Sequence, residues 1–262
     1  MSAIARAIVK SGLRAIEVEK RSRLGPEVYD SNKGIRETLM VETSRIVGRQ
    51  KGEALRLAVR QANQTLVNGD VIEFGTALGG TAMVLCASVA EANARRDCND
   101  PPRKVFLLDS FETFPEQIHK IDQDHVHSQL WAEASFNGMS PKQLGDACNH
   151  FLPPELVVIV PGFYSDTVPK LHKETRFAVV HIDCDLYQST IDALSPLFAG
   201  GMISRGGILM FDDWWLDGTK SLTGESAAWA DLVDQFKIEY SNIGSYGGDG
   251  HKLIVHGYDA GA

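Results

Sequence analysis

Acidic side chains follow two apolar runs late in the chain. Asp183 and Asp185 come after one run, and Asp212 and Asp213 come after the other. If both runs are parallel strands, these acids meet at the carboxyl edge of the sheet, where open α/β sheets bind ligands. Carboxylates so close together repel one another unless a cation neutralises them. Hard oxygen ligands favour Mg²⁺, Mn²⁺ or Ca²⁺ over zinc. The alternative to a metal site is a solvated acidic patch.

A glycine-rich turn, residues 75–81, joins an apolar run to a segment with helical periodicity. Glycines let the backbone approach a ligand, and the following helix N-terminus offers free N–H groups. In dinucleotide-binding folds such a turn receives pyrophosphate, which the carboxylate of Glu73 would repel here. That carboxylate suits an amino-bearing cation, so the turn favours S-adenosylmethionine over a nicotinamide cofactor. The alternative is a tight strand-to-helix connection without a ligand.

A second apolar run, residues 104–108, ends at Asp109 and Ser110. An acid at the end of the second strand of a Rossmann-like sheet commonly binds a ribose diol. Its carboxylate can accept a hydrogen bond from each hydroxyl, so we predict that Asp109 binds the cofactor ribose. The alternative role is a helix N-cap.

The elements that position these acids alternate along the chain. The predicted strands are residues 71–74, 104–108, 156–160, 177–182 and 207–211, with a late, antiparallel strand at 252–256, and the predicted helices between them include 79–94 and 190–197. Short apolar strands that alternate with helices are typical of a parallel sheet covered on both faces. The sequence therefore predicts an α/β fold with a Rossmann-like, mostly parallel sheet.

Two segments lie outside this alternation. Residues 1–67 predict an N-terminal helical arm or cap with helices at 3–19, 34–47 and 52–67, and residues 68–262 form the catalytic domain. The basic amphipathic helix at 3–19 suits a membrane surface, its own domain, a partner subunit or the mouth of the site. Its apolar face predicts a homo-oligomer. The His-rich insertion 119–153 is too long for a plain connection, and we predict a helical lid.

Composition narrows the class of protein. The chain has 262 residues, enough for one large α/β domain, and its formal charge is −8. Binding to nucleic acid needs Lys and Arg in excess, so that class is disfavoured. No apolar run approaches the ~18 residues that cross a bilayer. The four cysteines form no C-x-x-C pair, so we expect reduced thiols and a cytoplasmic protein.

In combination these motifs resemble the macrocin-type (TylF-like) metal-dependent O-methyltransferases, which act on sugars of natural products such as macrolide and aminocoumarin antibiotics. The resemblance runs from about Thr38 to the C-terminus, and its most specific pieces are residues 109–112, 161–169, 181–190 and 212–213. It implies the class I methyltransferase fold and Mg²⁺ bound by Asp183, Asp212 and Asp213. It also implies that Glu73 and Asp109 belong to the cofactor site.

The full cofactor site expected from the sequence comprises Thr38, Met40, Glu73, Gly75, Thr76, Gly80, Thr81, Asp109, Ser110, Asp166 and Asp183. The chain departs from the family at Ala77 and Leu78, where an aromatic residue and an arginine often precede the Gly-Gly pair. It also carries Trp214 and Trp215 after the Asp-Asp pair. These indoles suit stacking on a sugar or aromatic ring, or packing in the core.

The implied chemistry is methylation of a hydroxyl on a small molecule. A neutral alcohol is a weak nucleophile, so Mg²⁺ would bind two neighbouring hydroxyls and lower the pKa of one. A base then removes the proton as the methyl group transfers from S-adenosylmethionine. Asp185, beside the metal, is the first candidate base. His127, in the predicted lid, is the second because imidazole titrates near neutrality.

Three other functions fit parts of the pattern. A metal-dependent methyltransferase of phenols such as catechols would use the same metal chemistry. A nicotinamide-dependent oxidoreductase is disfavoured by Glu73 and by the turn, which lacks the G-x-G-x-x-G spacing. A protein that binds a cation only structurally is disfavoured by the number of convergent acids.

Overall fold

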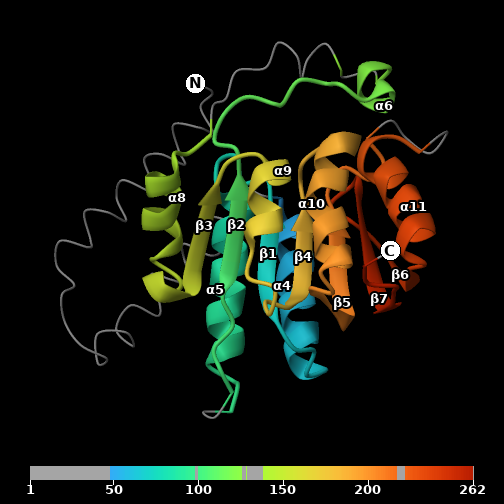
Figure 1. Cartoon of the computed structure of the whole chain (residues 1–262). Coiled ribbons are helices and arrows are strands. Elements are labelled where there is room, and N and C mark those ends of the chain that lie inside the picture. The colour runs from blue at the N-terminus through green and yellow to red at the C-terminus, as the bar shows by residue number, and fades with distance from the viewer. Residues whose placement is uncertain (1–47, 98–99, 126–127, 129–137, 217–221, 262) are drawn as a thin grey trace.

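A computed structural model describes residues 48–97, 100–125, 128, 138–216 and 222–261 (Figure 1). The strands are β1 (Asp70–Phe74), β2 (Val105–Asp109), β3 (Val157–Pro161), β4 (Phe177–Ile182), β5 (Ile203–Phe211), β6 (Glu239–Tyr246) and β7 (Gly250–Gly257). The helices are α4 (Arg49–Gln64), α5 (Gly80–Asn93), α6 (Lys120–Gln123), α8 (Pro141–Cys148), α9 (Tyr164–Thr167), α10 (Tyr187–Ala199) and α11 (Gly224–Phe236), with short 3-10 turns η1 (Pro154–Leu156) and η2 (Val168–Lys170).

All seven strands form one sheet in the order β3-β2-β1-β4-β5-β7-β6. The first five strands are parallel to their neighbours, and β7 runs antiparallel to both β5 and β6. The strand order reverses at β1, with β2 on one side and β4 on the other, which is where open α/β sheets bind ligands. This topology confirms the predicted Rossmann-like, mostly parallel sheet with a late antiparallel strand.

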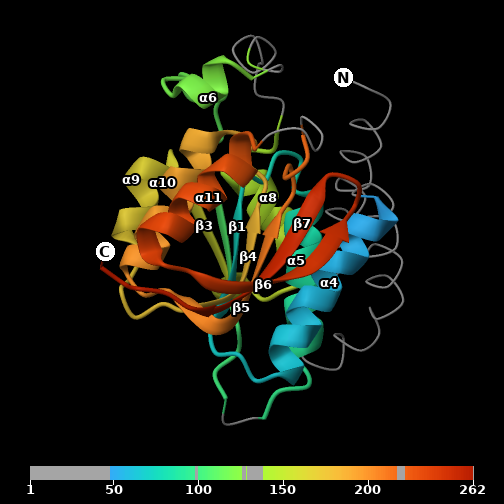
Figure 2. The same cartoon turned by 90° about the vertical axis from the view of Figure 1, so that its right-hand side faces the viewer.

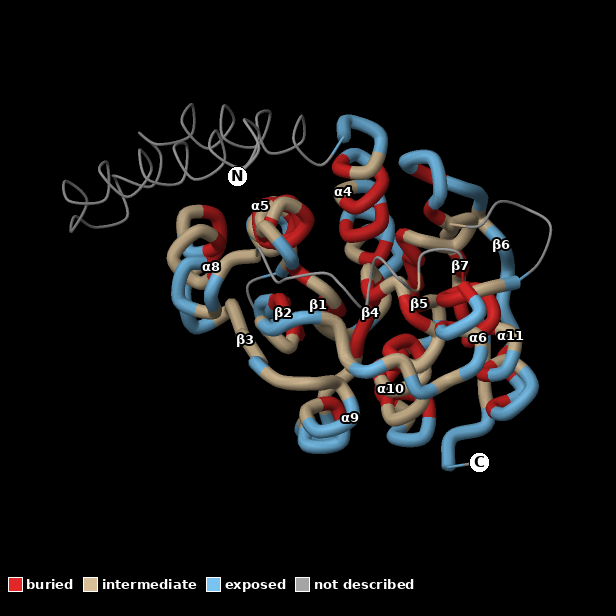
Figure 3. Tube along the Cα trace, turned by 90° about the horizontal axis from the view of Figure 1, so that it is seen from above, coloured by how far each residue is buried: buried red, intermediate tan, exposed pale blue. Residues whose placement is uncertain are grey.

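Helices cover both faces of the sheet. Viewed along the strands, α4, α5 and α8 form one layer, and α9, α10 and α11 lie on the opposite side (Figure 3). The view in Figure 2 shows the same two layers on either side of the sheet. Each layer has its own core of buried apolar side chains, one around Leu55, Leu85 and Met210 and the other around Phe198, Phe211 and Trp229. Burial on both faces explains why most residues of the parallel strands are apolar.

The pleat of the strands decides which face each polar residue meets. Val71 belongs to the core under α4 and α5, so Glu73, two residues later on β1, faces the same layer. Glu73 pairs in register with His181 on β4, and His181 pairs with Met210 on β5. Asp212 lies two residues after Met210 and returns to this face. One acid from β1, the imidazole from β4 and one acid after β5 therefore lie on the same side of the sheet.

Each predicted strand and helix in the described residues corresponds to an observed element, but β5 begins at Ile203 rather than at the predicted residue 207. Helix α10 extends the predicted 190–197 segment by about one turn, and α9, α11 and β6 were not predicted. Strand β6 is exposed along most of its length, so its sequence lacks the alternation that marks a half-buried strand. Helix α8 lies within the predicted lid segment but packs on the sheet, with Leu144 and Cys148 fully buried.

Several expectations fall on residues that the structure does not describe. The arm helices 3–19 and 34–47 lie outside the described residues, so the division at residues 67 and 68 stays a prediction. Cys86, Cys148 and Cys184 are buried and outside any disulfide. No helix among the described residues is long and apolar enough to span a bilayer.

Candidate active site

Three carboxylates meet at the carboxyl edge of the sheet. Asp183 follows β4, and Asp212 and Asp213 follow the neighbouring strand β5. One oxygen from each of the three carboxylates lies within 4.8 Å of the other two. The structure thus brings together the three residues that the sequence predicted as metal ligands.

Repulsion among the carboxylates of this acid cluster favours a bound cation. Burial and repulsion from Asp212 raise the pKa of Asp183 to about 8. Burial and the nearby carboxylates of Asp185, Asp183 and Asp212 raise the pKa of Asp213 to about 9. The cluster therefore retains protons near neutral pH unless a positive charge replaces them. Oxygen ligands of this kind suit Mg²⁺ or Mn²⁺, so the donor set fits the expected metal.

Lys51, which the sequence did not suggest, contributes one positive charge. It lies in the first turn of α4, and its ammonium group makes an ion pair with the carboxylate of Asp212. Burial acts to lower the pKa of Lys51, but Asp212, Asp183 and Asp213 outweigh that effect and raise the pKa above its ordinary value. Lys51 is therefore charged in the absence of a metal and neutralises part of the cluster.

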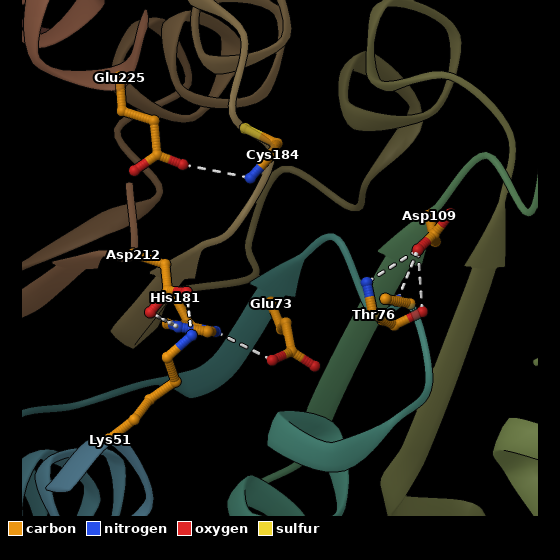
Figure 4. Close-up of polar contacts among 9 residues, drawn as sticks. Lys51, Glu73, Thr76, Asp109, His181, Cys184, Asp212 and Glu225 are labelled. Carbon is orange, nitrogen blue, oxygen red and sulfur yellow. Dashed lines mark hydrogen bonds and ion pairs between the residues drawn. The ribbon is translucent and has the colours of Figure 1, made fainter. Parts of the chain in front are cut away.

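Beneath the cluster, His181 lies between two acids (Figure 4). Its Nδ1 is 2.9 Å from Oε1 of Glu73, and its Nε2 is 3.9 Å from Oδ1 of Asp212, an ion-pair distance rather than a hydrogen bond. Burial would lower the pKa of His181, but the carboxylates of Asp212 and Glu73 raise it to about 10. The imidazole is thus a cation at neutral pH, and it is packed in the core rather than aimed at a ligand.

Glu73, His181, Asp212 and Lys51 therefore form a row of groups with alternating charge. Burial would raise the pKa of Asp212, yet the cations on either side lower it below its ordinary value. Buried charges are costly to desolvate unless each has an opposite partner. The row satisfies this condition and leaves Asp212 ionised in the metal-free protein, ready to bind a metal.

The glycine-rich turn packs directly on the loop that carries Asp183. Gly75 has a φ of +88°, and a Cβ atom there would lie 1.8 Å from the carbonyl oxygen of Asp183. The backbone N–H of Asp183 also donates to the carbonyl oxygen of Phe74, at 2.9 Å. Only glycine permits this approach. The expected cofactor turn and the acid cluster thus share one wall.

Asp109 holds the turn in shape. Its Oδ2 accepts from the backbone N–H and the hydroxyl of Thr76, at 2.7 and 3.0 Å, and from the N–H of Ala77 at 3.3 Å. Its Oδ1 accepts from the N–H of Phe111 at 2.8 Å. Since each carboxylate oxygen has two lone pairs, Oδ1 retains room for one more donor such as a ribose hydroxyl.

A cavity of about 410 Å³ connects the turn to the acid cluster. Its lining includes five predicted residues, namely Gly75, Asp109, Ser110, Asp183 and Asp185. It also includes residues that the prediction missed, namely Ala77, Leu78, Glu112, Thr113, Phe114, Pro115, Gly138, Phe163, Tyr164, Ser165, Cys184, Ser189 and Asp192. Three of these missed residues, Phe163, Tyr164 and Ser165, lie in the motif at residues 161–169, from which the sequence analysis predicted only Asp166.

Other predicted cofactor residues lie away from this lining. Glu73 is fully buried against His181, and Thr76 faces Asp109. Gly80 and Thr81 begin α5 without lining the cavity, and the side chain of Asp166 is exposed on α9. Thr38, Met40 and His127 lie outside the described residues.

The start of the His-rich insertion is fixed to α10. The carboxylate of Asp122 in α6 accepts from the backbone N–H of Tyr187 at 2.7 Å and of Gln188 at 3.1 Å, and so caps that helix. The ring of His119 stacks on the ring of Tyr187, with 4.1 Å between their centroids. Figure 1 shows α6 beyond the carboxyl edge of the strands. The start of the insertion, at α6, therefore lies beyond the carboxyl edge of the sheet and is bonded to the N-terminus of α10.

The tryptophans after Asp213 pack on the β6–β7 hairpin. Trp214 stacks on His251, with 4.9 Å between ring centroids, and meets the ring of Phe211 edge-on at 5.1 Å. The backbone N–H of Trp215 donates to the carbonyl oxygen of Asp249 at 3.0 Å. These contacts give both indoles a packing role beside the acid cluster, and neither lines the cavity.

Comparison with known proteins agrees with the geometry of the site. The family described as macrocin O-methyltransferase (TylF) matches residues 23–238. The 8-demethyl-8-(2,3-dimethoxy-alpha-L-rhamnosyl)-tetracenomycin-C 4'-O-methyltransferase of Streptomyces olivaceus is 31% identical over 182 residues, which are 66% of this chain and 63% of that protein. The demethyldecarbamoylnovobiocin O-methyltransferase of Streptomyces niveus is 29% identical over 192 residues, 72% of this chain and 70% of that protein.

A solved structure supports the fold. The O-methyltransferase NovP superposes with a TM-score of 0.65 at 25% identity, over 81% of this chain and 82% of that one. Among the relatives compared by sequence, the Streptomyces olivaceus enzyme is longer, and this chain spans slightly less than two thirds of its length.

Proposed function

The chain belongs to the macrocin O-methyltransferase family, and from this premise we propose that it transfers a methyl group from S-adenosylmethionine to a hydroxyl of a small-molecule natural product, with Mg²⁺ at the acid cluster. One observation carries the proposal. The carboxylates of Asp183, Asp212 and Asp213 converge within 4.8 Å, and Asp183 also lines the cavity that begins at the glycine-rich turn. A metal-bound hydroxyl and a methyl donor would therefore share one cavity.

The cofactor assignment rests on the turn and on Asp109. Gly75 lets the turn pack closely on the loop that carries Asp183, and it lines the cavity. Asp109 lines the same cavity at the end of β2 and has an unused lone pair for a ribose hydroxyl. The cavity volume of about 410 Å³ is in the range that holds a small cofactor.

In the proposed reaction the chain positions two hydroxyls and removes one proton. Asp183, Asp212 and Asp213 would hold Mg²⁺, which when bound supplies a Lewis acid that lowers the pKa of a hydroxyl. Asp185 lines the cavity two residues after Asp183, and its carboxylate is our candidate for the base. Its backbone has a φ of +59°, a left-handed conformation that costs free energy for a residue other than glycine and often marks a functional site.

The acceptor class comes from the relatives. The name of the Streptomyces olivaceus enzyme specifies a rhamnosyl-bearing acceptor, so we propose a sugar hydroxyl of a glycosylated small molecule. The cytoplasmic location and the homo-oligomer expected from the sequence remain part of this proposal. Size-exclusion chromatography with light scattering measures the oligomeric state.

A direct test uses the purified chain with S-adenosylmethionine, Mg²⁺ and a panel of glycosides and catechols. Mass spectrometry should detect the addition of one methyl group to a glycoside, and chelation with EDTA should abolish that product until Mg²⁺ is restored. Methylation of catechols alone would replace the sugar acceptor with a phenol. Full activity in EDTA would eliminate the metal from the mechanism.

A further inference from the structure

Glu225 joins the two loops that carry the acid cluster. Its Oε1 accepts from the backbone N–H of Cys184 at 3.1 Å, and its Oε2 accepts from the backbone N–H of Asp213 at 3.1 Å. Figure 4 shows the bond from Cys184, which directly follows Asp183 in the sequence. One buried carboxylate thus spans the gap between the loop after β4 and the loop after β5.

The helix that carries Glu225 does not need this carboxylate for its own N-terminus. Thr223 and Ser226 form a capping box that already satisfies the end of α11, and the N–H of Thr223 donates to the hydroxyl oxygen of Ser226 at 3.1 Å. An acid in the first turn of a helix commonly serves the helix dipole. Here the side chain leaves its own helix and bonds to two other segments.

The backbone next to Glu225 packs closely on the loop after β4. Gly224 has a φ of +47°, and a Cβ atom there would lie 2.4 Å from the carbonyl oxygen of Asp185. The start of α11 is therefore in direct contact with the loop after β4. This contact brings Glu225 within reach of both loops at once.

A carboxyl group is the side chain that this position requires. The two N–H donors bond to different oxygens of Glu225, and the amide of glutamine offers only one oxygen. The side chain of Glu225 is fully buried, and burial of a carboxyl group is costly. An apolar residue would be less costly here unless the two hydrogen bonds serve a purpose.

We infer that Glu225 is a positioning residue for the metal site, which fixes the separation of Asp183 from Asp213 by binding the backbone of both loops. The inference rests on the metal role in the proposed function. Replacement of a group that orients metal ligands without binding the metal itself typically lowers metal affinity by about 10- to 100-fold.

Mn²⁺ alone, titrated into the full chain and followed by electron paramagnetic resonance, tests the inference without a turnover assay. Glu225→Gln keeps the shape but loses one acceptor oxygen, and Glu225→Asp keeps the carboxyl group but shortens the side chain, so that it no longer reaches both loops. Both variants should weaken Mn²⁺ binding by about tenfold or more and change S-adenosylmethionine affinity by less than about twofold. Because Glu225→Asp retains the carboxyl group, it carries the test even if Glu225→Gln fails to fold by circular dichroism.

The matched control is Asp70→Asn. The Oδ1 of Asp70 also accepts a backbone N–H, from Lys104 at 2.8 Å, but at the amino end of β1. This control should bind Mn²⁺ as the unchanged chain does.

Each outcome of the titration separates the two proposals. If the unchanged chain does not bind Mn²⁺, the proposed function fails and this inference fails with it. If the unchanged chain binds and both Glu225 variants match it, only the positioning role is overturned. The role is also overturned if Glu225→Asp binds normally while Glu225→Gln does not, since a carboxyl group that does not span both loops would then suffice. It is overturned as well if both variants lose S-adenosylmethionine affinity to the same extent as Mn²⁺ affinity.

Discussion

The imidazole of His181 and the carboxylate of Glu73 face each other across neighbouring strands β4 and β1, with 2.9 Å between Nδ1 and Oε1. Both side chains are fully buried, and the pair lies directly beneath Asp212. The core of the sheet is therefore electrostatically connected to the acid cluster above it. Asp212 keeps its negative charge because cations flank it on both sides.

Glu73→Gln should destabilise the protein by about 3–5 kcal/mol. The substitution leaves the buried His181 cation without its partner, and breaking one side of a buried pair has this typical cost. Urea unfolding followed by circular dichroism measures the change. Glu91→Gln, which removes a partly exposed partner of Arg56, should cost less than about 1 kcal/mol. If Glu73→Gln instead leaves stability intact and abolishes S-adenosylmethionine binding, Glu73 serves the cofactor.

Lys51→Met should tighten Mn²⁺ binding by about threefold to tenfold. The ammonium group occupies the immediate neighbourhood of Asp212, and its removal relieves repulsion between two cations near one carboxylate. Titration followed by electron paramagnetic resonance measures the affinity. Lys142→Met, at an exposed pair with Asp146, is the control and should have no effect. Weaker binding in Lys51→Met would mean that the lysine helps to hold the site together.

Stability in the absence of metal should decline as the pH rises from 6.5 to 9. The pKa values of Asp183, about 8, and Asp213, about 9, lie far above the ordinary 3.8. The folded chain thus binds more protons than the unfolded chain in this interval, and the free energy of unfolding falls as those protons leave. The raised pKa of His181, about 10 against 6.5, acts in the same direction.

Thermal denaturation in EDTA checks this pH dependence. The melting temperature should be lower at the alkaline end, and added Mg²⁺ should raise it more there, because the ligands have already lost their protons. A melting temperature that is unchanged or higher at alkaline pH would contradict the raised pKa values.

Asp109→Asn should weaken S-adenosylmethionine binding by about tenfold or more while Mn²⁺ affinity stays the same. The amide cannot accept all the hydrogen bonds that Oδ1 and Oδ2 receive from the turn, and it loses the charge that favours a ribose hydroxyl. Isothermal titration calorimetry with each ligand measures both constants. Ser110→Ala, at the next residue of the cavity lining, provides a milder comparison. Unchanged cofactor affinity in Asp109→Asn would remove this residue from the ribose site.

Asp212→Asn should reduce the methylation rate by about 100-fold or more, with little change in S-adenosylmethionine affinity. The substitution removes a ligand charge from the acid cluster but leaves the glycine-rich turn intact. Rates come from product mass spectrometry, and cofactor affinity comes from calorimetry. Asp192→Asn, on α10 in the cavity lining, is the control and tests whether loss of a carboxylate outside the acid cluster has the same effect. Loss of cofactor binding in Asp212→Asn would show that this residue had been assigned to the wrong ligand.

The local sequence pattern was sufficient to predict the parts of the site that lie at strand ends. Apolar runs of strand length identified β4 and β5, and parallel strands necessarily present their carboxyl ends at one edge. Asp183, Asp212 and Asp213 could therefore be grouped from sequence before any distance was known. The same reasoning located the glycine-rich turn and Asp109, since both follow strands that lie next to one another at the centre of the sheet.

Partners that join distant segments depended on the tertiary structure. Lys51 meets Asp212 across 161 positions of sequence, and Glu225 reaches Cys184 from a helix that the sequence did not predict. Glu73 turned out to face His181 rather than the cavity because strand register and pleat decide which side of the sheet a residue meets. Sequence determined which chemical groups this protein places at the edge of its sheet, because strand ends follow from local periodicity. Which charges neutralise those groups was decided only when helices α4 and α11 packed against the sheet, since packing alone brings remote side chains within bonding distance.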